Sequence, residues 1–276
     1  MGIHGPIFIG ALGGSGTRAI AELFYNAGVF IGNKLNHALD NRLFSLFSSP
    51  SLPIVLKDKT MIIERINLLH LLSTQKSPDL STYCHLLKYL PGIDLKGHDC
   101  DYVKKQVIDQ YCPEIQPKFW GFKNPRSHFF SKQLLKHLPY SRFVYVVRHG
   151  LDMAYSNNNR QIKKYGDVYR LKTDVLLPLP KDIFLFWVAA LKNVIQIKKN
   201  YPDRVYILKF EEFVNKPHDQ SIRLLDFSGI DFQSQEVDKW CRHVIVPKSI
   251  NRYKHQDLRW VDNNMINLLE TAGYKI

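Results

Sequence analysis

Cysteine is scarce in this 276-residue chain, and long apolar runs are absent. The four cysteines, Cys84, Cys100, Cys112 and Cys241, include no C-x-x-C pair, so the sequence offers neither metal-ligand spacing nor a dense disulfide framework. We expect reduced, buried thiols, no bound metal and a cytoplasmic protein. No apolar run approaches the ~20 residues of a membrane span, and no signal-peptide pattern precedes the first predicted strand. We therefore expect no integral membrane segment.

Acidic residues are also in short supply. Lys and Arg total 38 against 25 Asp and Glu, which gives a formal net charge of +13. Such a balance favours anionic partners such as nucleotides, acidic sugars, nucleic acid or membrane surfaces, although it can also serve solubility alone. The basic residues are dispersed and no known nucleic-acid module is found, so nucleic acid is not the expected partner. The sequence leaves the oligomeric state open.

Short apolar runs alternate with amphipathic segments along the chain. Strands are predicted at 7–10, 119–125, 142–150 and 204–210, and helices at 17–27, within 60–110, at 127–139, from about 150, at 182–200, within 221–244 and at 262–272. Strands alternating with helices indicate the α/β class, with a central, mostly parallel sheet flanked by helices. Residues 161–180 are predicted to form an excursion, and no break in composition divides the chain. We expect a single domain over residues 1–276.

The stretch "GALGGSGTRAIAELF" (10–24) predicts a strand, a glycine-rich turn and a helix. The loop residues concerned are Gly13, Gly14, Ser15, Gly16, Thr17 and Arg18. In an α/β sheet this turn lies at the carboxyl edge, where glycines let backbone N–H groups face a ligand and the helix N-terminus adds partial positive charge. The turn therefore predicts a phosphate site. The alternative is a glycine turn that only packs the helix against the strand.

Two common phosphate-loop classes fit poorly. Gly16 is followed by Thr17 and Arg18, so the Walker lysine is missing, which argues against an ATP or GTP enzyme. Gly14, Gly16 and Ala19 match the dinucleotide pattern G-x-G-x-x-A. That pattern needs an acidic residue after a second strand, whereas the apolar run "VFIG" (29–32) is followed by Asn33.

The S-G-T-R sequence resembles the 5′-phosphosulfate loop of sulfotransferases, in the variant where glycines and an arginine replace P-K-S-G-T-T. A second stretch, "YVVRHGLDMAYS" (145–156), places Arg148 after a strong strand and Ser156 on a following helix. Arg148, Asp152 and Ser156 match the 3′-phosphate motif of that family, Arg-x-x-x-Asp-x-x-x-Ser, in register. An arginine fork and a serine hydroxyl both bind phosphate well. An arginine salt-bridged at a strand end is the alternative for Arg148 alone.

Three further stretches occur in the order typical of sulfotransferases. "WGFKNP" resembles the strand whose lysine, here Lys123, faces the sulfonate. "YILKFEEFVNKPHDQSIRLLDFSGI" is similar to the later strand-to-helix stretch. "SINRYKH" resembles the basic loop that approaches the 3′-phosphate and contains Arg252. The resemblance spans nearly the whole chain and implies the P-loop NTPase-like sulfotransferase fold. One departure is that Gly14 replaces the loop lysine of cytosolic members, so Arg18 or Lys123 would have to supply that charge.

The resemblance implies an enzyme whose donor is 3′-phosphoadenosine 5′-phosphosulfate (PAPS) and whose product is adenosine 3′,5′-bisphosphate (PAP). The sulfuryl group would pass by in-line displacement, without a metal, to a hydroxyl or amine of a glycan, a lipid or a small molecule. A helical insertion at about 33–115 would form the acceptor side. The alternatives are a non-catalytic nucleotide- or glycan-binding protein of the same fold, and a magnesium-dependent, kinase-like phosphotransferase.

The catalytic base has three candidates. Glycan-modifying members use a carboxylate from the segment after the first helix, and Asp40 is the only carboxylate in residues 33–44. Cytosolic members use a histidine two residues after the lysine, a spacing that this chain lacks, although His128 follows closely and His37 is a third possibility. Each could instead play only a structural role. Candidates for stacking on adenine are Trp120, Tyr155 and Tyr253.

Overall fold

The computed structural model describes residues 4–94, 99–171 and 178–276. The chain forms two compact units. The first unit comprises the chain up to Ile9 together with Ile20–Phe143, and the second comprises Gly10–Ala19 together with Val144–Ile276. The glycine-rich turn near the N-terminus therefore belongs to the same unit as the C-terminal half of the chain.

The four strands form one parallel sheet in the order β2-β1-β3-β4. They are β1 (His4–Ala11), β2 (Phe119–Lys123), β3 (Arg142–Val147) and β4 (Val205–Lys209). In the first unit β1 and β2 pair in parallel, with Ile9 opposite Lys123. The run at 29–32 adds only an isolated bridge between Phe30 and Trp120. The predicted α/β class with a mostly parallel sheet is confirmed, and β2 ends before Pro125, which cannot continue a ladder.

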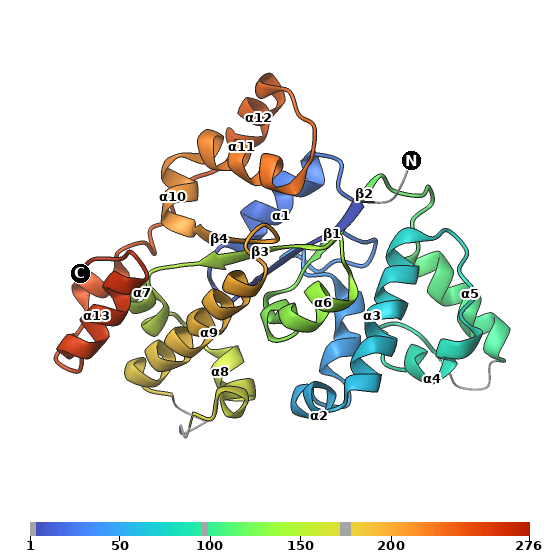
Figure 1. Ribbon diagram of the computed structural model, residues 1–276, viewed down its shortest axis with the longest axis horizontal. Coiled ribbons are helices and arrows are strands. Elements are labelled where there is room, and N and C mark those ends of the chain that lie inside the picture. The colour runs from blue at the N-terminus through green and yellow to red at the C-terminus, as the bar shows by residue number, and fades with distance from the viewer. Residues whose placement is uncertain (1–3, 95–98, 172–177) are drawn as a thin grey trace. The chain divides into compact units, whose positions relative to one another are not determined.

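Within residues 52–137 of the first unit, the helices gather around α3 (Figure 1). They are α2 (Leu52–Lys57), α3 (Lys59–Thr74), α4 (Cys84–Leu87), α5 (Cys100–Tyr111) and α6 (Ser131–His137). Asp58 caps α3 by accepting a hydrogen bond from the Met61 N–H (3.0 Å). Helix α3 packs against α2, α5, α6 and strand β2. The helices predicted within 60–110 correspond to α3, α4 and α5.

The second unit contains one long helix and several short ones. They are α7 (Gly150–Ala154), α8 (Arg160–Tyr165), α9 (Pro180–Asn200), α10 (Phe210–Asn215), α11 (Pro217–Ser228), α12 (Ser234–Cys241) and α13 (Asn263–Thr271). Helix α9 packs against α7 and β4. Its first residue is Pro180, whose fixed φ suits a helix start. Helix α11 ends at Ser228 and is followed by Gly229 in the left-handed region. The excursion predicted at 161–180 contains α8, and its residues 172–177 lie outside the described part.

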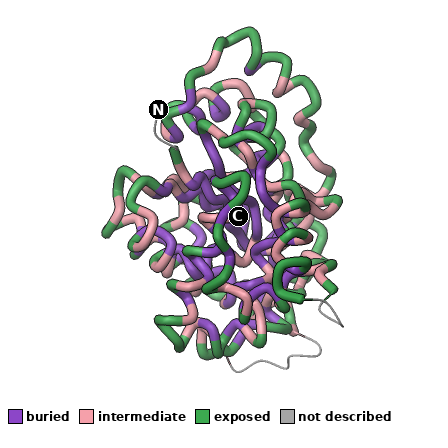
Figure 2. Tube along the Cα trace, turned by 90° about the vertical axis from the view of Figure 1, so that its right-hand side faces the viewer, coloured by how far each residue is buried: buried purple, intermediate pink, exposed green. Residues whose placement is uncertain are grey.

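Figure 2 shows the buried stretches in purple and the exposed loops and helix faces in green. Most buried residues are apolar, but the described part of the chain also buries the charged side chains of Arg65, Lys123, Arg148 and Asp152. Charged groups are rarely buried unless they are paired or functional. Arg65 has a structural role, because it donates to the carbonyls of Leu46 (2.6 Å) and Ser49 (2.5 Å). Among the described residues, no helix is long and apolar enough to cross a membrane.

Candidate active site

The glycine-rich turn joins β1 to α1 (Thr17–Asn26) in the conformation that its glycines allow. The Ser15 N–H donates to the Leu12 carbonyl at 3.2 Å and closes the turn. Gly14 and Gly16 have φ values of 94° and 86°, which side-chain-bearing residues rarely adopt. A Cβ on Gly16 would lie 2.0 Å from the ring of Phe210. Only glycine fits at this position, because the ring packs directly on the backbone.

The other predicted loop residues fall in the same turn. A Cβ on Gly13 would lie 3.1 Å from the side-chain amide of Asn158, so this backbone is also closely covered. The side chains of Ser15 and Thr17 are buried. Arg18, in the first turn of α1, is exposed. The turn therefore combines a close-packed backbone with one accessible cation at the start of a helix, where an anion is favoured.

Arg148 follows β3 and points its guanidinium at the glycine turn. Its side chain is only 4% exposed. Nη1 donates to the Gly14 carbonyl at 3.3 Å, and Nη2 donates to the Ser249 hydroxyl at 2.9 Å. The guanidinium carbon lies 5.6 Å from the centre of the Phe210 ring. The structure thus brings together the two predicted anion-binding elements within the second unit.

The environment of Arg148 suits an anionic ligand. Burial lowers the pKa of Arg148, and the nearby Arg252 cation lowers it further, whereas Asp152 opposes the shift. The Nε–H of Arg148 is buried and has no hydrogen-bond partner among the described residues. A buried donor without an acceptor costs about 1–3 kcal/mol. A phosphate oxygen would satisfy this donor and compensate the buried charge.

Asp152 fastens the basic loop to Arg148. Its carboxylate is 1% exposed and accepts hydrogen bonds from the backbone N–H groups of Asn251 (2.9 Å) and Tyr253 (3.3 Å). One of its oxygens also lies 3.7 Å from Arg148 Nη2. The sequence motif includes Asp152 but does not reveal this role, because the contacts join residues about a hundred positions apart.

Ser156 lies just after α7 and not on it, in contrast to the prediction. The helix ends at Ala154, and its last turn tightens because the Ser156 N–H donates to the carbonyl of Met153 at 3.0 Å. Ser156 nevertheless remains beside the glycine turn, since its hydroxyl would lie 3.2 Å from a Cβ on Gly14. Ser156 therefore lies beside the glycine turn on a turn that follows α7, and its predicted role toward the 3′-phosphate stays a prediction.

Arg252 is tied to its own loop and to the end of α7. Its Nε donates to the Ser249 carbonyl (3.0 Å), and its Nη1 donates to the Tyr155 carbonyl (3.4 Å). Ser249 thus contacts both arginines of the cluster, through its hydroxyl and through its backbone. The sequence prediction missed Ser249 as a site residue. Its place as the first residue of the "SINRYKH" stretch was the available indication.

The aromatic candidates for adenine differ in accessibility. Trp120 is completely buried in the first unit and is unavailable for stacking on a ligand. Tyr253 is 3% exposed and already stacks on the ring of His149, with 4.5 Å between ring centres. Tyr155 is half-buried, and its hydroxyl accepts a hydrogen bond from Trp260 Nε1 at 2.8 Å. Of the three, only Tyr155 retains accessible ring surface of any extent.

In the first unit, Lys123 and Asp40 form an ion pair. Lys123, at the end of β2, is 3% exposed. Its Nζ lies 2.5 Å from Asp40 Oδ1 and donates to the Ala38 carbonyl at 2.8 Å. The second carboxylate oxygen of Asp40 accepts a hydrogen bond from Asn36 Nδ2 at 2.9 Å. The side chain of Asp40 remains 26% exposed, so the carboxylate is both held in place and reachable.

A local turn places this carboxylate. The side-chain oxygen of Asn36 accepts from the N–H groups of Ala38 (2.8 Å) and Asp40 (2.9 Å), which is the bonding of an Asx turn. Leu39 takes a left-handed conformation with φ 62°. Asn41, the residue after Asp40, donates its N–H to the Lys123 carbonyl at 2.8 Å. The turn is therefore fastened to the strand end that carries the lysine.

The two histidine candidates have opposite environments. His37 is exposed within the same turn as Asp40. His128 is 0% exposed in a short 3-10 helix (Pro125–Phe129), and its ring centre lies 4.0 Å from that of Phe129. A base must come within hydrogen-bonding reach of the acceptor. On this criterion Asp40 and His37 are accessible, and His128 is not.

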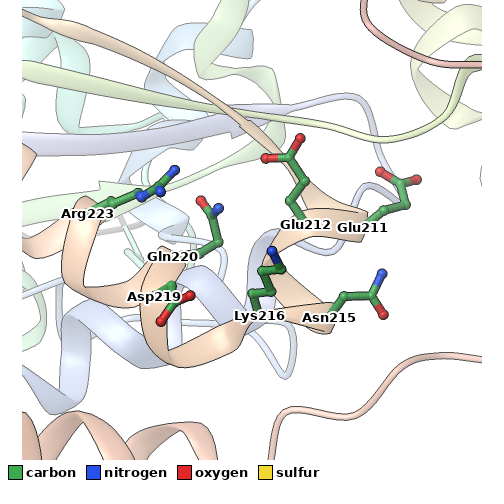
Figure 3. A pocket seen from close by; sticks show the side chains of 7 residues that line it. All are labelled: Glu211, Glu212, Asn215, Lys216, Asp219, Gln220 and Arg223. Carbon is green, nitrogen blue, oxygen red and sulfur yellow. The ribbon is translucent and has the colours of Figure 1, made fainter.

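A separate cavity of about 420 Å³ lies along α10 and α11 (Figure 3). It is lined by Glu211, Glu212, Asn215, Lys216, Asp219, Gln220 and Arg223. Its three carboxylates outnumber its two cations, so it suits an anionic donor less well than the Arg148 cluster does. Glu211 also has a structural role, since it accepts from the His149 N–H (2.8 Å) and the Tyr274 hydroxyl (3.1 Å). The described residues include no cluster of three or more metal-ligating side chains.

Comparison with known proteins decides the family. The family model described as "Sulfotransferase family" matches residues 6–234. The chain belongs to the sulfotransferase family. Enzymes of this family generally depend on PAPS, and no curated protein matches this sulfotransferase in sequence.

Solved structures share the fold of this sulfotransferase. The sulfotransferase domain from the curacin biosynthetic pathway has a TM-score of 0.53 and 13% identity, with 100% of each chain covered. The sulfotransferase STF9 from Mycobacterium avium has a TM-score of 0.51 and 13% identity, with 99% of this chain and 76% of that chain covered. At such low identity these similarities establish the fold, and the predicted sulfotransferase fold is confirmed.

Proposed function

We propose that this sulfotransferase moves a sulfuryl group from PAPS to a hydroxyl or amine of its acceptor and releases PAP. The observation that carries the proposal is the buried guanidinium of Arg148. It bonds to the glycine turn through Gly14 and to the basic loop through Ser249, and it keeps one buried donor without a partner among the described residues. A phosphate oxygen of a doubly phosphorylated nucleotide would provide an anionic acceptor for that donor.

In the donor site we propose, two elements of the second unit each bind one phosphate group of the nucleotide. The turn from Gly13 to Thr17 and the start of α1 receive the 5′-phosphosulfate through backbone N–H groups. The 3′-phosphate binds to the side chains of Arg148, Ser156 and Arg252. Arg18 supplies the positive charge that the loop lysine carries in cytosolic members, because it is the exposed cation of the first helical turn.

In the catalytic step we propose, Asp40 accepts the proton of the acceptor hydroxyl or amine. The acceptor atom forms its bond to sulfur as the bond between sulfur and the bridging oxygen breaks, and PAP leaves with that electron pair. Lys123 holds Asp40 in position and stabilises negative charge on the transferring group. His37 and His128 are the alternative bases, and the burial of His128 ranks it last of the three.

We propose that residues 1–276 act as one sulfotransferase domain in which the helical insertion at about 33–115 forms the acceptor side. This segment contains the Asx turn that presents Asp40, and it also holds α2 to α5. The expected acceptors are glycans, lipid headgroups or small molecules with a free hydroxyl or amine.

Thermal unfolding with nucleotides tests the donor. PAP without added metal, at a hundred times its dissociation constant, should stabilise the ligand-free protein by about 2.7 kcal/mol. Adenosine 5′-monophosphate at the same concentration should stabilise it less. Arg148→Ala should abolish most of the difference between the two nucleotides. An unchanged melting temperature with PAP, in folded and ligand-free protein, would contradict the proposed donor. If the protein binds the donor but converts no PAPS to PAP with any acceptor of a broad panel, the non-catalytic alternative is favoured.

A further inference from the structure

Two cysteines of the first unit touch each other. Cys84 is the first residue of α4 and Cys100 is the first residue of α5, and their sulfur atoms lie 2.6 Å apart. Cys100 is exposed and Cys84 is half-buried, so the expectation of buried thiols is wrong for this pair. The remaining cysteines behave differently. Cys112 is buried, and the thiol of Cys241 contacts the Ser221 hydroxyl at 3.3 Å.

Contacts at both ends of α5 hold the two thiols together. Near the thiols, Lys104 Nζ donates to the Ser81 hydroxyl at 3.1 Å, which ties the first turn of α5 to the residues before α4. At the other end of α5, the Tyr111 hydroxyl donates to the Pro91 carbonyl at 2.9 Å. Neither bond involves sulfur. The thiol contact is therefore set by the packing of two segments, and the sulfur atoms, 2.6 Å apart, must approach only slightly to form a bond of about 2.05 Å.

We propose that Cys84 and Cys100 are a redox pair that forms a reversible disulfide linking α4 to α5. The oxidant is another disulfide, such as oxidised glutathione. The Cys100 thiolate attacks one sulfur of the oxidant and releases one thiol. The Cys84 thiolate then attacks Cys100, forms the intramolecular bond and releases the second thiol. Two protein thiols lose two electrons, the oxidant gains them, and the two protons pass to the released thiols.

The surroundings favour this order of attack. Cys100 is the more exposed sulfur, so an oxidant reaches it first. The hydrogen bond to Cys100 raises the pKa of Cys84, burial raises it further, and Lys104 opposes the shift. Once Cys100 is in a mixed disulfide, that thiol–thiol hydrogen bond is lost, while Lys104 still favours a Cys84 thiolate. The lysine thus supports the second attack, which completes the bond.

The bond would act locally. It closes the chain between the starts of two helices, and a closed loop of this kind stabilises a fold mainly by restricting the unfolded chain. Both cysteines lie in the first unit, whereas the glycine turn and Arg148 belong to the second. The inference does not depend on the identity of the donor or the acceptor.

The test oxidises the full chain with oxidised glutathione and then blocks remaining thiols with iodoacetamide under denaturing conditions. Peptide mass spectrometry should find Cys84 joined to Cys100, with Cys112 and Cys241 alkylated. Oxidation should raise the melting temperature by several degrees, and dithiothreitol should reverse the rise. Cys84→Ser should lose the rise and accumulate glutathione on Cys100, whereas Cys241→Ser, the control, should behave as wild type.

Either of two results would overturn the proposal. One is a stable glutathione adduct on Cys100 of the wild-type protein. The Cys84 thiol is held in contact with Cys100 and should therefore displace glutathione from this adduct faster than free glutathione does. The other is a Cys84 that is alkylated in full after oxidation. If Cys84→Ser fails to fold, the peptide map of the oxidised wild-type protein and the Cys100→Ser variant still show whether Cys84 and Cys100 are joined by a disulfide.

Discussion

The Arg148 cluster and the Asp40 turn are built in different ways. Arg148 and Asp152 are almost wholly buried, and their partners in the basic loop lie about a hundred positions away in the chain. Asp40 is a quarter exposed and is placed by Asn36, four positions before it. The first arrangement fixes charge away from the protein surface, and the second offers an accessible carboxylate on a local turn. These two designs fit the proposed roles, in which Arg148 binds the donor and Asp40 reacts with an external acceptor.

The largest effect that we expect separates reaction from binding. Asp40→Asn should cut turnover by about 10²–10⁴-fold, the usual contribution of a positioned general base, while PAP affinity stays nearly unchanged. Single-turnover kinetics with a verified acceptor and calorimetry with PAP measure the two quantities. Asp58→Asn, which removes a helix-capping carboxylate of the same unit, should leave the rate close to wild type.

Variants of His37 and His128 test the two alternative bases. If Asp40→Asn turns over at the wild-type rate, the assignment to Asp40 is wrong, and His37→Asn and His128→Asn identify the base. A histidine base should also lose activity below about pH 6.5, because its protonated form cannot accept the proton.

Arg148→Ala should weaken PAP binding by roughly 10- to 150-fold, since hydrogen bonds to a charged group contribute about 1.5–3 kcal/mol. Turnover with saturating donor should change much less than it does in Asp40→Asn. Isothermal titration gives the affinity. Arg204→Ala is the matched control, because Arg204 is also an arginine of the second unit beside an aromatic ring, that of Tyr201 at 5.3 Å. Equal losses in both variants would mean that Arg148 has no special part in the site.

Gly16→Ala and Gly28→Ala distinguish backbone strain from steric conflict. Both glycines have positive φ, so alanine strains both positions. A Cβ meets the Phe210 ring at 2.0 Å only at Gly16, and nothing lies within 4 Å of a Cβ at Gly28. We expect Gly16→Ala to lose about 1–3 kcal/mol more free energy of unfolding than Gly28→Ala, the range for overpacking. Urea denaturation measures the difference, and equal losses would show that the ring moves aside freely.

The smallest effect concerns Ser156. A neutral hydroxyl contributes about 1 kcal/mol, so Ser156→Ala should weaken PAP binding only about fivefold. Ser228→Ala removes a buried hydroxyl that has no partner among the described residues and should leave the affinity unchanged. A loss for Ser156→Ala as large as that for Arg148→Ala, measured by the same titration, would require a different division of roles at the 3′-phosphate.

Short patterns in the sequence predicted the strands and most helices, because these depend on local periodicity. The motif that joins Arg148, Asp152 and Ser156 is also compact, and its role in binding the 3′-phosphate stays a prediction. The hydrogen bonds that the N–H groups of Asn251 and Tyr253 donate to the Asp152 carboxylate could not be predicted, since nothing near Asp152 in the sequence indicates those partners. The pairing of Lys123 with Asp40, 83 positions apart, was equally inaccessible. Ser156 was placed on a helix because the pattern gives no indication that the last turn tightens after Ala154.

The split of the chain between the two units has a consequence for biosynthesis. Gly16 is synthesised well before Phe210, which packs on it, and Arg148 is synthesised well before Ser249, to which it donates. The cluster around Arg148 therefore stays incomplete until both partners have been made, and long-range contacts of this kind form slowly. A nascent chain stopped before the "SINRYKH" stretch has the glycines and Arg148 but lacks the loop that Asp152 anchors. The proposed nucleotide site can therefore form only after that stretch has been synthesised.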